Sequence, residues 1–179
     1  MKTLTLLRHA KSSWDDAVRR DFDRPLNAKG RRAAVAMGRH LKAEGLAFDH
    51  LVASPARRVT ETLDGFAGGY GALPEVVEDR RVYLASAPML LDVVRELPAQ
   101  AERVLLVGHN PGLEDLVLML TPDEDGPTRD AVEEKYPTAS VAELRFDVDD
   151  WAAVDAGTGE LARFVRPRDL DPTLGPDAA

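Results

Sequence analysis

The stretch from Thr3 to Trp14, TLTLLRHAKSSW, begins as a run of apolar and β-branched residues and passes directly into the pair Arg8 and His9. An apolar run of this kind is typical of a strand buried in a parallel sheet. Thr3–Leu7 is therefore the first predicted strand, with Arg8 and His9 at its carboxyl end. An unpaired charge is costly inside a core, so we expect this pair at an open edge of the sheet.

A second segment, RVLLVGHNPGLEDL, repeats the pattern. Arg103–Val107 is the clearest strand of the chain, and His109 follows its end. We expect Asn110 to cap a helix whose first residue is Pro111. The imidazole of His109 then lies near the positive end of a helix, which disfavours its protonation and favours a bound anion.

A third segment reads HLVASPARRVTETL and predicts a short strand, Leu51–Ala53. Ser54 is expected as the N-cap and Pro55 as the first residue of a helix that carries Arg57 and Arg58. Positive side chains in the first turn of a helix oppose its dipole unless they reach solvent or an anion. Because ligands bind at the carboxyl ends of parallel strands, all three segments point to one site.

The remaining pattern predicts helices over 27–44 and 88–97, strands over 76–77, 139–146 and 160–165, a surface loop over 121–137 and a loose chain from 167 onward. Strands and helices alternate, which indicates a sheet between two helical layers. The last two strands have no helix between them. We therefore predict an α/β fold, a three-layer α/β/α sandwich around a mostly parallel, mixed sheet. The length suits one domain, placed at 1–170, with a loose C-terminal tail at 171–179.

The composition excludes several classes of protein. The net charge is −8, from 31 acidic against 23 basic residues, which argues against a nucleic-acid partner. No apolar run is long enough for a membrane span, and no signal peptide is visible. The chain has no cysteine, which is compatible with a cytoplasmic location. Residues 1–60 nevertheless carry 13 Lys and Arg against 6 Asp and Glu, so the positive charge gathers where the Arg–His pair lies.

Two imidazoles and two guanidiniums at one sheet edge are suited to binding and attacking a phosphoryl group. A single histidine is more often structural, and we expect His40 and His50 at the surface. The acidic run Asp123–Asp125 lacks the ligand spacing of a calcium loop. No other nucleotide or metal motif is present, so neither a metal nor a cofactor is expected.

Taken together, three motifs resemble those of the histidine phosphatase superfamily, which has a phosphoglycerate mutase-like fold. They are LLRHAKSSW with the Arg–His pair, SPARRVTET with Arg58, and LVGHNPG with His109. Within that superfamily the chain looks most like the short SixA-like phosphohistidine phosphatases, because DRPLNAKGRRAA, LVGHNPGLEDL and FVRPRDL also fit them. The resemblance covers about residues 2–170.

The resemblance implies a covalent mechanism without a metal. His9 would be the nucleophile that carries the phosphoryl group, and Arg8, Arg58 and His109 would bind its oxygens. Ser12 is a weaker candidate for an oxygen contact. Water would then hydrolyse the phosphohistidine.

One departure from the superfamily bears on the substrate. Larger relatives carry a glutamate that protonates the leaving alkoxide, and Leu84 stands at the corresponding position here, with Glu78 and Asp79 close enough in sequence to substitute. A missing acid favours phosphohistidine, whose imidazole leaving group is readily protonated near neutrality. We therefore predict a phosphatase acting on phosphohistidine in a signalling or phosphocarrier protein, with no nucleic-acid or membrane partner. The alternatives are a broad small-molecule phosphomonoesterase and a non-catalytic module that binds phosphorylated ligands.

Overall fold

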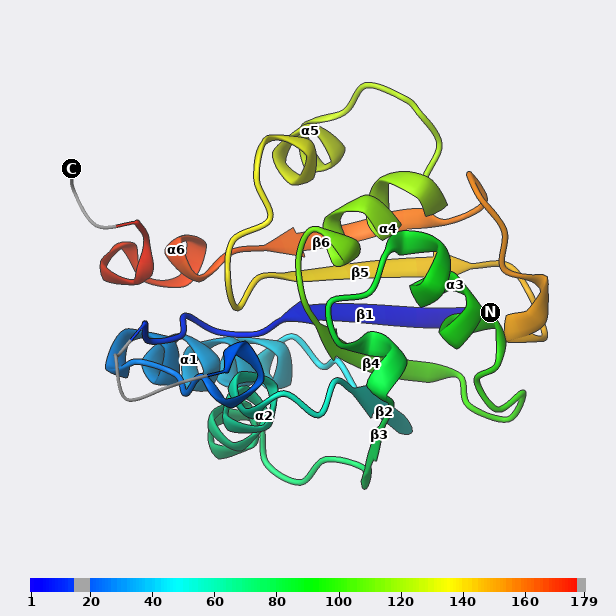
Figure 1. Cartoon of the computed structure of the whole chain (residues 1–179). Helices are drawn as coiled ribbons and strands as arrows, with labels where there is room; N and C mark the ends of the chain where they lie inside the picture. The colour runs from blue at the N-terminus through cyan, green and yellow to red at the C-terminus, as the bar shows by residue number, and fades with distance from the viewer. Residues whose placement is uncertain (15–19, 177–179) are drawn as a thin grey trace.

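The computed structural model describes residues 1–14 and 20–176, and this part of the chain folds around one mixed sheet (Figure 1). Its strands are β1 (Lys2–Arg8), β2 (His50–Ala53), β3 (Val76–Glu78), β4 (Arg103–Gly108), β5 (Val141–Phe146) and β6 (Glu160–Val165). They lie in the order β3-β2-β4-β1-β5-β6. Strands β3, β2, β4 and β1 run parallel to one another, and β5 is antiparallel to both of its neighbours, β1 and β6. The predicted mostly parallel, mixed sheet is confirmed.

Helices cover both faces of the sheet. They are α1 (Ala28–Ala43), α2 (Arg57–Tyr70), α3 (Ala87–Arg95), α4 (Gly112–Leu120), α5 (Pro127–Glu134) and the single turn α6 (Pro167–Leu170), with short 3₁₀ turns at Asp21–Asp23, Arg80–Val82, Trp151–Ala153 and Pro172–Leu174. In Figure 1, α1 and α2 lie on one side of the sheet, and α3, α4 and α5 lie on the other. This is the predicted three-layer sandwich.

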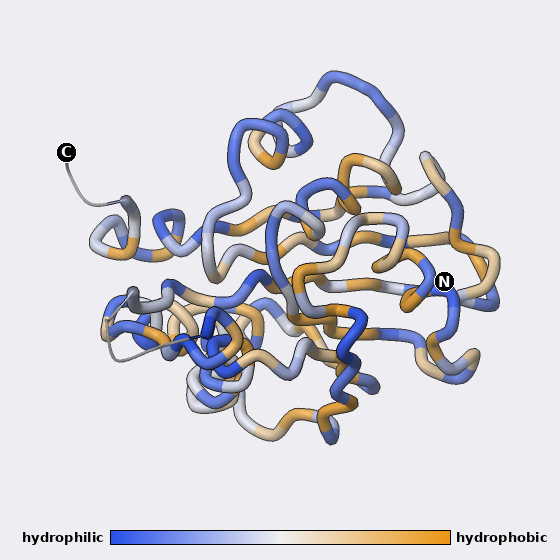
Figure 2. The backbone as a smooth tube through the Cα atoms, in the orientation of Figure 1, coloured by the Kyte–Doolittle hydropathy of each residue, from blue (hydrophilic) through white to orange (hydrophobic). Residues whose placement is uncertain are grey.

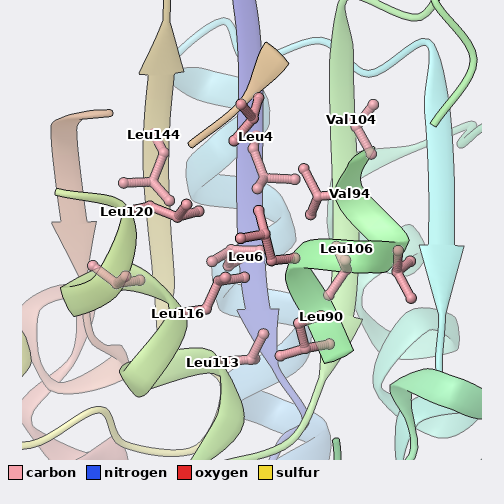
Figure 3. Packing of buried hydrophobic residues seen from close by; sticks show 14 of the residues in the cluster. Leu4, Leu6, Leu90, Val94, Val104, Leu106, Leu113, Leu116, Leu120 and Leu144 are labelled. Atoms are coloured by element: carbon pink, nitrogen blue, oxygen red, sulfur yellow. The ribbon is translucent and has the colours of Figure 1, made fainter. Parts of the chain in front are cut away.

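Alternation along the strands divides the core between the two faces. Leu4, Leu6 and Leu106 pack against α3 and α4, as Figure 3 shows. Leu7 and Leu105 point the other way, into the cluster formed with α1 and α2. Because successive side chains of a strand point to opposite faces, one fully apolar run supplies both halves of the core.

The helix after the first loop begins as the sequence predicts. The side chain of Asn27 accepts a hydrogen bond from the backbone of Gly30 at 2.7 Å and caps α1. A Cβ atom on Gly30 would lie 2.1 Å from the carbonyl oxygen of Lys11. Glycine is needed here because the loop that leaves the Arg–His pair crosses the helix at this point.

Two helix starts differ from the prediction by one or two residues. The helix expected from Pro55 begins at Arg57, with Ala56 as its N-cap. The helix expected from Pro111 begins at Gly112, although the Asn110 side chain still accepts from the backbone of Glu114 at 3.2 Å.

The predicted surface loop at 121–137 is wrong in part, because it contains α5. This helix starts at Pro127, and Val132 is its one buried residue. A single apolar contact leaves no helical period to read in the sequence. Figure 2 shows the mainly hydrophilic connection that leads into α5.

The chain from Pro167 onward has more structure than expected. The backbone N–H of Arg166 donates to the Asp169 side chain at the start of α6, and the backbone N–H of Asp169 donates to the carbonyl oxygen of Arg166. Leu174, in the following 3₁₀ turn, packs against the cluster that contains Ala33 and Ala34. Residues 177–179 of the predicted tail lie outside the described residues. None of the described helices has both the length and the apolar character needed to cross a membrane.

Candidate active site

The two histidines singled out in the sequence meet at one edge of the sheet. Strands β1 and β4 are parallel neighbours, and Arg8 stands opposite Gly108 in their register. His9 and His109 therefore follow at the same level, and the backbone N–H of His9 donates to the carbonyl oxygen of Gly108 at 3.0 Å. Their ring centroids are 5.3 Å apart.

The four principal predicted residues and Ser12 line one pocket of about 360 Å³. Its other described lining residues are Lys11, Trp14, Asp21, Arg24, Leu84, Asn110 and Thr138. This volume is in the range of small-ligand sites and is ample for a phosphoryl group. The structure thus brings together every residue that the sequence proposed for the site.

The environment of His9 fixes its tautomer. Its Nδ1 lies 2.7 Å from the carbonyl oxygen of Ala10, which can only accept, so Nδ1 carries the proton. The Ala10 peptide is held in turn, because its N–H donates to Thr62 Oγ1 at 2.8 Å. The lone pair of a neutral His9 ring is therefore on Nε2.

Burial is the main reason that the pKa of His9 is lowered from 6.5 to about 3. The nearby charged residues lower this pKa further, and the hydrogen bond to Ala10 raises it by less than burial lowers it. The ring is therefore neutral at physiological pH. A neutral imidazole with a free Nε2 lone pair has the state that nucleophilic attack requires.

Arg8 is anchored by Tyr136, which lies between α5 and β5. Its Nη1 donates to the carbonyl oxygen of Tyr136 at 2.8 Å, and the Tyr136 hydroxyl donates back to Leu6 at 2.6 Å. The Nε of Arg8 is buried and has no hydrogen-bond partner in the described part of the chain. Burial lowers the pKa of Arg8 from its ordinary value, yet a guanidinium keeps its charge in proteins.

Arg58 is the arginine of its pair that points into the site. Its side chain is 3% exposed and donates to the backbone oxygen of Asp21 at 2.8 Å and to Asp21 Oδ2 at 3.0 Å. Arg57 turns outward and pairs with Glu61 at 2.7 Å. Arg58, and not Arg57, is the arginine that the resemblance of SPARRVTET assigned to the site, and Arg58 lines the pocket.

The two ring nitrogens of His109 both have partners. Arg58 Nη2 lies 3.3 Å from Nδ1, and a guanidinium can only donate, so Nδ1 accepts. The proton is then on Nε2, which lies 2.8 Å from Ser54 Oγ. Burial first, and then the charge of Arg58, lower the pKa of His109 to about 3. His9 and His109 are thus neutral in opposite tautomers.

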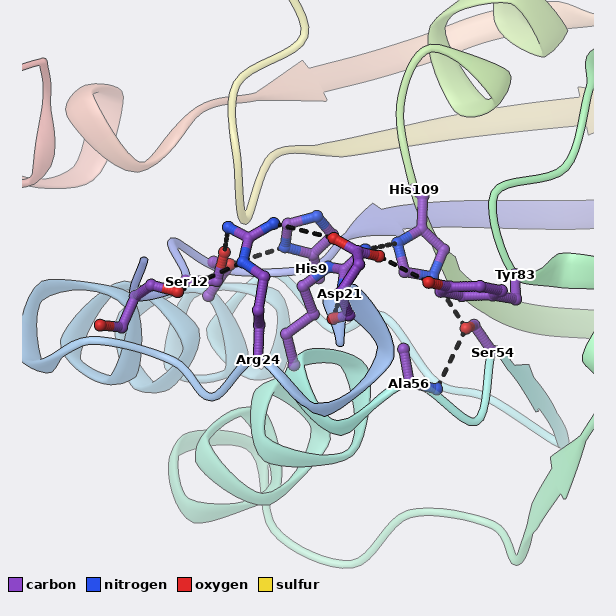
Figure 4. Close-up of polar contacts among 11 residues, drawn as sticks. His9, Ser12, Asp21, Arg24, Ser54, Ala56, Tyr83 and His109 are labelled. Carbon is purple, nitrogen blue, oxygen red and sulfur yellow. Dashed lines mark hydrogen bonds and ion pairs between the residues drawn. The ribbon is translucent and has the colours of Figure 1, made fainter. Parts of the chain in front are cut away.

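Asp21 is a site residue that the sequence reasoning missed. Its carboxylate accepts from the Tyr83 hydroxyl at 2.6 Å, from Arg24 at 3.0 Å and from Arg58 at 3.0 Å. Figure 4 shows Asp21 between Arg24 and Tyr83. Burial alone would raise the pKa of Asp21, but the three hydrogen bonds together lower it to about 2. Asp21 is therefore ionised at neutral pH and adds one negative charge to the otherwise cationic lining of the pocket.

Ser12 lies in the pocket wall and is held by Arg24. Arg24 Nη2 donates to Ser12 Oγ, and the guanidinium carbon of Arg24 lies 3.3 Å from the ring centroid of Trp14. Trp14 is 79% exposed, which is unusual for so large an aromatic side chain. Arg24 and Trp14 together extend the pocket outward from Ser12.

The position expected for a general acid holds no acid. Leu84 lines the pocket and is 55% exposed, in the left-handed backbone region with φ of 49°. Asp79 accepts hydrogen bonds from Arg81, and neither Asp79 nor Glu78 is among the described lining residues. Asp21 is the one carboxylate of the described lining, and its low pKa keeps it ionised.

The missed residues left weak signals in the sequence. The sequence predicts Ser54 as a helix cap, and its Oγ does accept from the backbone of Ala56 at 3.3 Å, but it also lies 2.8 Å from Nε2 of His109. Asp21 and Arg24 lie in a polar loop without periodicity. Arg24 is part of the quoted DRPLN motif, which was the one available hint.

Comparisons with known proteins identify the family of the chain. A family model described as the histidine phosphatase superfamily, branch 1, matches residues 4–82. A protein of Mycobacterium tuberculosis, itself named only as uncharacterized, is 32% identical over 164 residues, covering 90% of this chain and 100% of the relative.

Two similar solved structures are each titled "putative phosphohistidine phosphatase SixA". The one from Nakamurella multipartitia is 30% identical, covers 93% of this chain and 96% of its own, and superposes with a TM-score of 0.81. The one from Agrobacterium tumefaciens is 25% identical, with coverages of 93% and 98% and a TM-score of 0.74. With the Arg–His pair, Arg58 and His109 around one pocket, the chain is a phosphatase that belongs to the histidine phosphatase superfamily.

Proposed function

We propose that the protein hydrolyses phosphohistidine in a signalling or phosphocarrier protein, through a phosphohistidine intermediate on His9. The observation that carries the choice of substrate is the composition of the pocket. It holds a neutral nucleophile and several cations, while Leu84 stands where a proton donor would be needed for a poor leaving group.

In the first step, Nε2 of His9 attacks phosphorus, and the bond from phosphorus to the leaving nitrogen of the substrate breaks. The transferring group carries its charge on three equatorial oxygens, and catalysis of such transfers rests on positioning and on nearby cations. Arg8 and Arg58 supply these cations. No step requires a metal in this scheme.

His109 is assigned to bind a phosphoryl oxygen from Nδ1. This requires a change of tautomer, because Nδ1 accepts from Arg58 in the present structure. Ser54 makes the change possible, since its hydroxyl can accept from Nε2 or donate to it at the same 2.8 Å separation. Ser54 is therefore a positioning residue for His109.

In the second step, water attacks the phosphohistidine on His9, the P–N bond breaks and inorganic phosphate leaves. The imidazole released from the substrate in the first step needs no strong acid, because it takes up a proton near neutrality. An alkoxide does need one. The ionised Asp21, with a pKa of about 2, cannot supply that proton.

The surroundings of the pocket also support a protein substrate. Trp14 and Leu84 are large apolar side chains exposed at its mouth, a combination suited to contact with another macromolecule. The two similar structures named above are described as putative phosphohistidine phosphatases, which supports the same substrate here. A cytoplasmic location remains a prediction from composition.

The test compares three substrates at the same enzyme concentration: a phosphohistidine protein, p-nitrophenyl phosphate and a simple alkyl phosphate. Each is assayed with and without a chelator. We expect the phosphohistidine protein to be hydrolysed far faster than the alkyl phosphate, and chelator to have no effect. An alkali-stable, acid-labile phosphoryl label should form on the wild type and not on His9→Ala. Equal or faster turnover of the alkyl phosphate would overturn the assignment of the substrate.

The same experiment separates the two alternatives. A small-molecule phosphomonoesterase would also lose its label in His9→Ala but would show no preference for phosphohistidine. A non-catalytic binding module would bind the substrates with no turnover in either protein.

A further inference from the structure

A second pocket adjoins the catalytic one and has no part in the chemistry described above. Its volume is about 350 Å³, close to that of the catalytic pocket. Arg8, Lys11 and Thr138 line both, so the two share a wall. A ligand that occupied the catalytic pocket would therefore have this second pocket directly beside it.

The second pocket is strongly cationic. The charged residues of its described lining are Arg8, Lys11, Lys29, Lys135, Arg166 and Arg168, and none of the described lining residues is acidic. This contrasts with the chain as a whole, whose net charge is −8. Like charges gathered around one hollow repel each other, and a bound anion removes that repulsion.

The cations come from distant parts of the chain. Arg8 ends β1, Lys29 lies on α1, Lys135 follows α5, and Arg166 and Arg168 lie at α6. The fold therefore assembles the pocket, and no single run of basic residues explains it.

Part of this lining is fixed in place. Arg166 is held by Asp169 at 2.9 Å, and Lys29 donates to the carbonyl oxygen of Gly175. Lys135 and Arg168 are exposed, and among the described residues neither forms an ion pair. They have charge available for a ligand.

We propose that this second pocket binds a phosphate-class anion beside the scissile phosphoryl group. A phosphate presents several oxygens and about two charges in a compact volume, which suits several converging cations better than a single carboxylate does. Arg8 separates the two pockets, so one molecule with two phosphate groups could occupy both. The anion is either a second phosphate of the substrate or a free phosphate ion.

This inference goes beyond the proposed function and does not depend on it, because it concerns binding and not the leaving group. The probes are α,ω-alkylene bisphosphonates of increasing chain length, each compared with the alkyl monophosphonate of the same length. These compounds are not hydrolysed, so calorimetric titration reports affinity whether or not phosphohistidine is the substrate.

The test variant is Lys135→Ala/Arg168→Ala, which lies outside the catalytic pocket. The matched control is Arg39→Ala/Arg80→Ala, which removes the same charge from exposed positions that line neither pocket. We expect one bisphosphonate to bind the wild type about tenfold more tightly than its monophosphonate. The test variant should lose this difference, and the control should keep it.

Two further readouts complete the test. Turnover of p-nitrophenyl phosphate, which has one phosphate, should be unchanged in the test variant, and the thermal unfolding midpoint should show that it folds. If free phosphate is the ligand, titration with inorganic phosphate should give two sites in the wild type and one in the test variant. If only a linked second phosphate reaches the second pocket, both proteins should show a single site. Equal affinities for bisphosphonates and monophosphonates together with one phosphate site in every protein would overturn the proposal.

Discussion

The carbonyl oxygen of Ala10 lies 2.7 Å from Nδ1 of His9, and this contact determines which nitrogen of the ring keeps a free lone pair. The residue that follows His9 thus sets its tautomer, through the backbone. The Oγ1 of Thr62, on α2, accepts from the backbone N–H of the same residue, Ala10. His9 follows the first strand, and α2 holds the residue that orients its ring.

The first prediction concerns these tautomers. In ¹⁵N spectra of the imidazole side chains, His9 should be protonated at Nδ1 and His109 at Nε2 when no ligand is bound. Neither ring should take up a proton at any pH near neutrality, because both pKa values lie at about 3. His9→Ala and His109→Ala assign the signals. Titration of either ring near 6.5, its ordinary value, would contradict the burial that we describe.

The second prediction concerns stability and pH. The pKa of each of these histidines is about 3 in the folded protein and 6.5 without the fold's influence. Below 6.5 the unfolded chain binds protons that the folded chain does not, so the free energy of unfolding falls as the pH falls. Each histidine contributes a slope of at most about 1.4 kcal/mol per pH unit.

Asp21 adds to this loss at lower pH. Its lowered pKa stabilises the fold above its ordinary value of 3.8, and this contribution is lost as the pH falls towards about 2. Urea unfolding at a series of pH values measures the slope. His9→Gln, which cannot take up a proton, should remove about half of the part due to the two histidines. An unchanged slope in that variant would show that His9 is protonated in the folded state.

Sequence reasoning predicted the catalytic edge well because it follows from strand direction. Apolar runs that end in Arg8–His9 and in His109 are legible without coordinates, and parallel neighbours must bring their ends together. In the structure Arg8 pairs with Gly108, which brings the residues that follow them, His9 and His109, to the same level.

The same reasoning could not reach the contacts made by loops. Asp21 and Arg58 are 37 positions apart, and no pattern in the polar segment around Asp21 indicates their pairing. Local propensity predicts Ser54 as a cap and gives no sign that its hydroxyl also contacts His109. In both cases the controlling interaction is long-range, which local patterns do not contain.

The third prediction concerns the carboxylate of Asp21, which accepts a hydrogen bond from Nη2 of Arg58, a donor that a phosphoryl group would need. Asp21→Asn keeps the shape and removes the charge. Inorganic phosphate should then inhibit the enzyme about tenfold more strongly, because the pocket becomes more positive. The control is Asp23→Asn, a neighbouring carboxylate that pairs with Arg20 at 2.7 Å outside the pocket. Weaker inhibition in Asp21→Asn would mean that Asp21 mainly holds Arg58 in place.

The last prediction tests whether the missing acid decides the substrate. Leu84 lines the pocket, so Leu84→Glu places a carboxyl group at the position where the resemblance places the acid of larger relatives. General acids contribute about 10²- to 10⁴-fold in enzymes where they are well placed, and we expect a gain of about tenfold on an alkyl phosphate from this unrefined position. Hydrolysis of phosphohistidine should not improve, because its leaving group needs no such donor.

The matched control is Leu84→Gln, which has nearly the same shape and no proton to give. Both variants share the same left-handed backbone position, with φ of 49°, so any strain is common to them. The gain on alkyl phosphate should appear in Leu84→Glu alone and should decline at high pH as the introduced carboxyl group ionises. If both variants turn over alkyl phosphate at the wild-type rate, proton donation at this position does not limit the reaction. The preference for phosphohistidine would then have to come from the walls of the pocket, and Trp14 and Arg24 would be the next residues to replace.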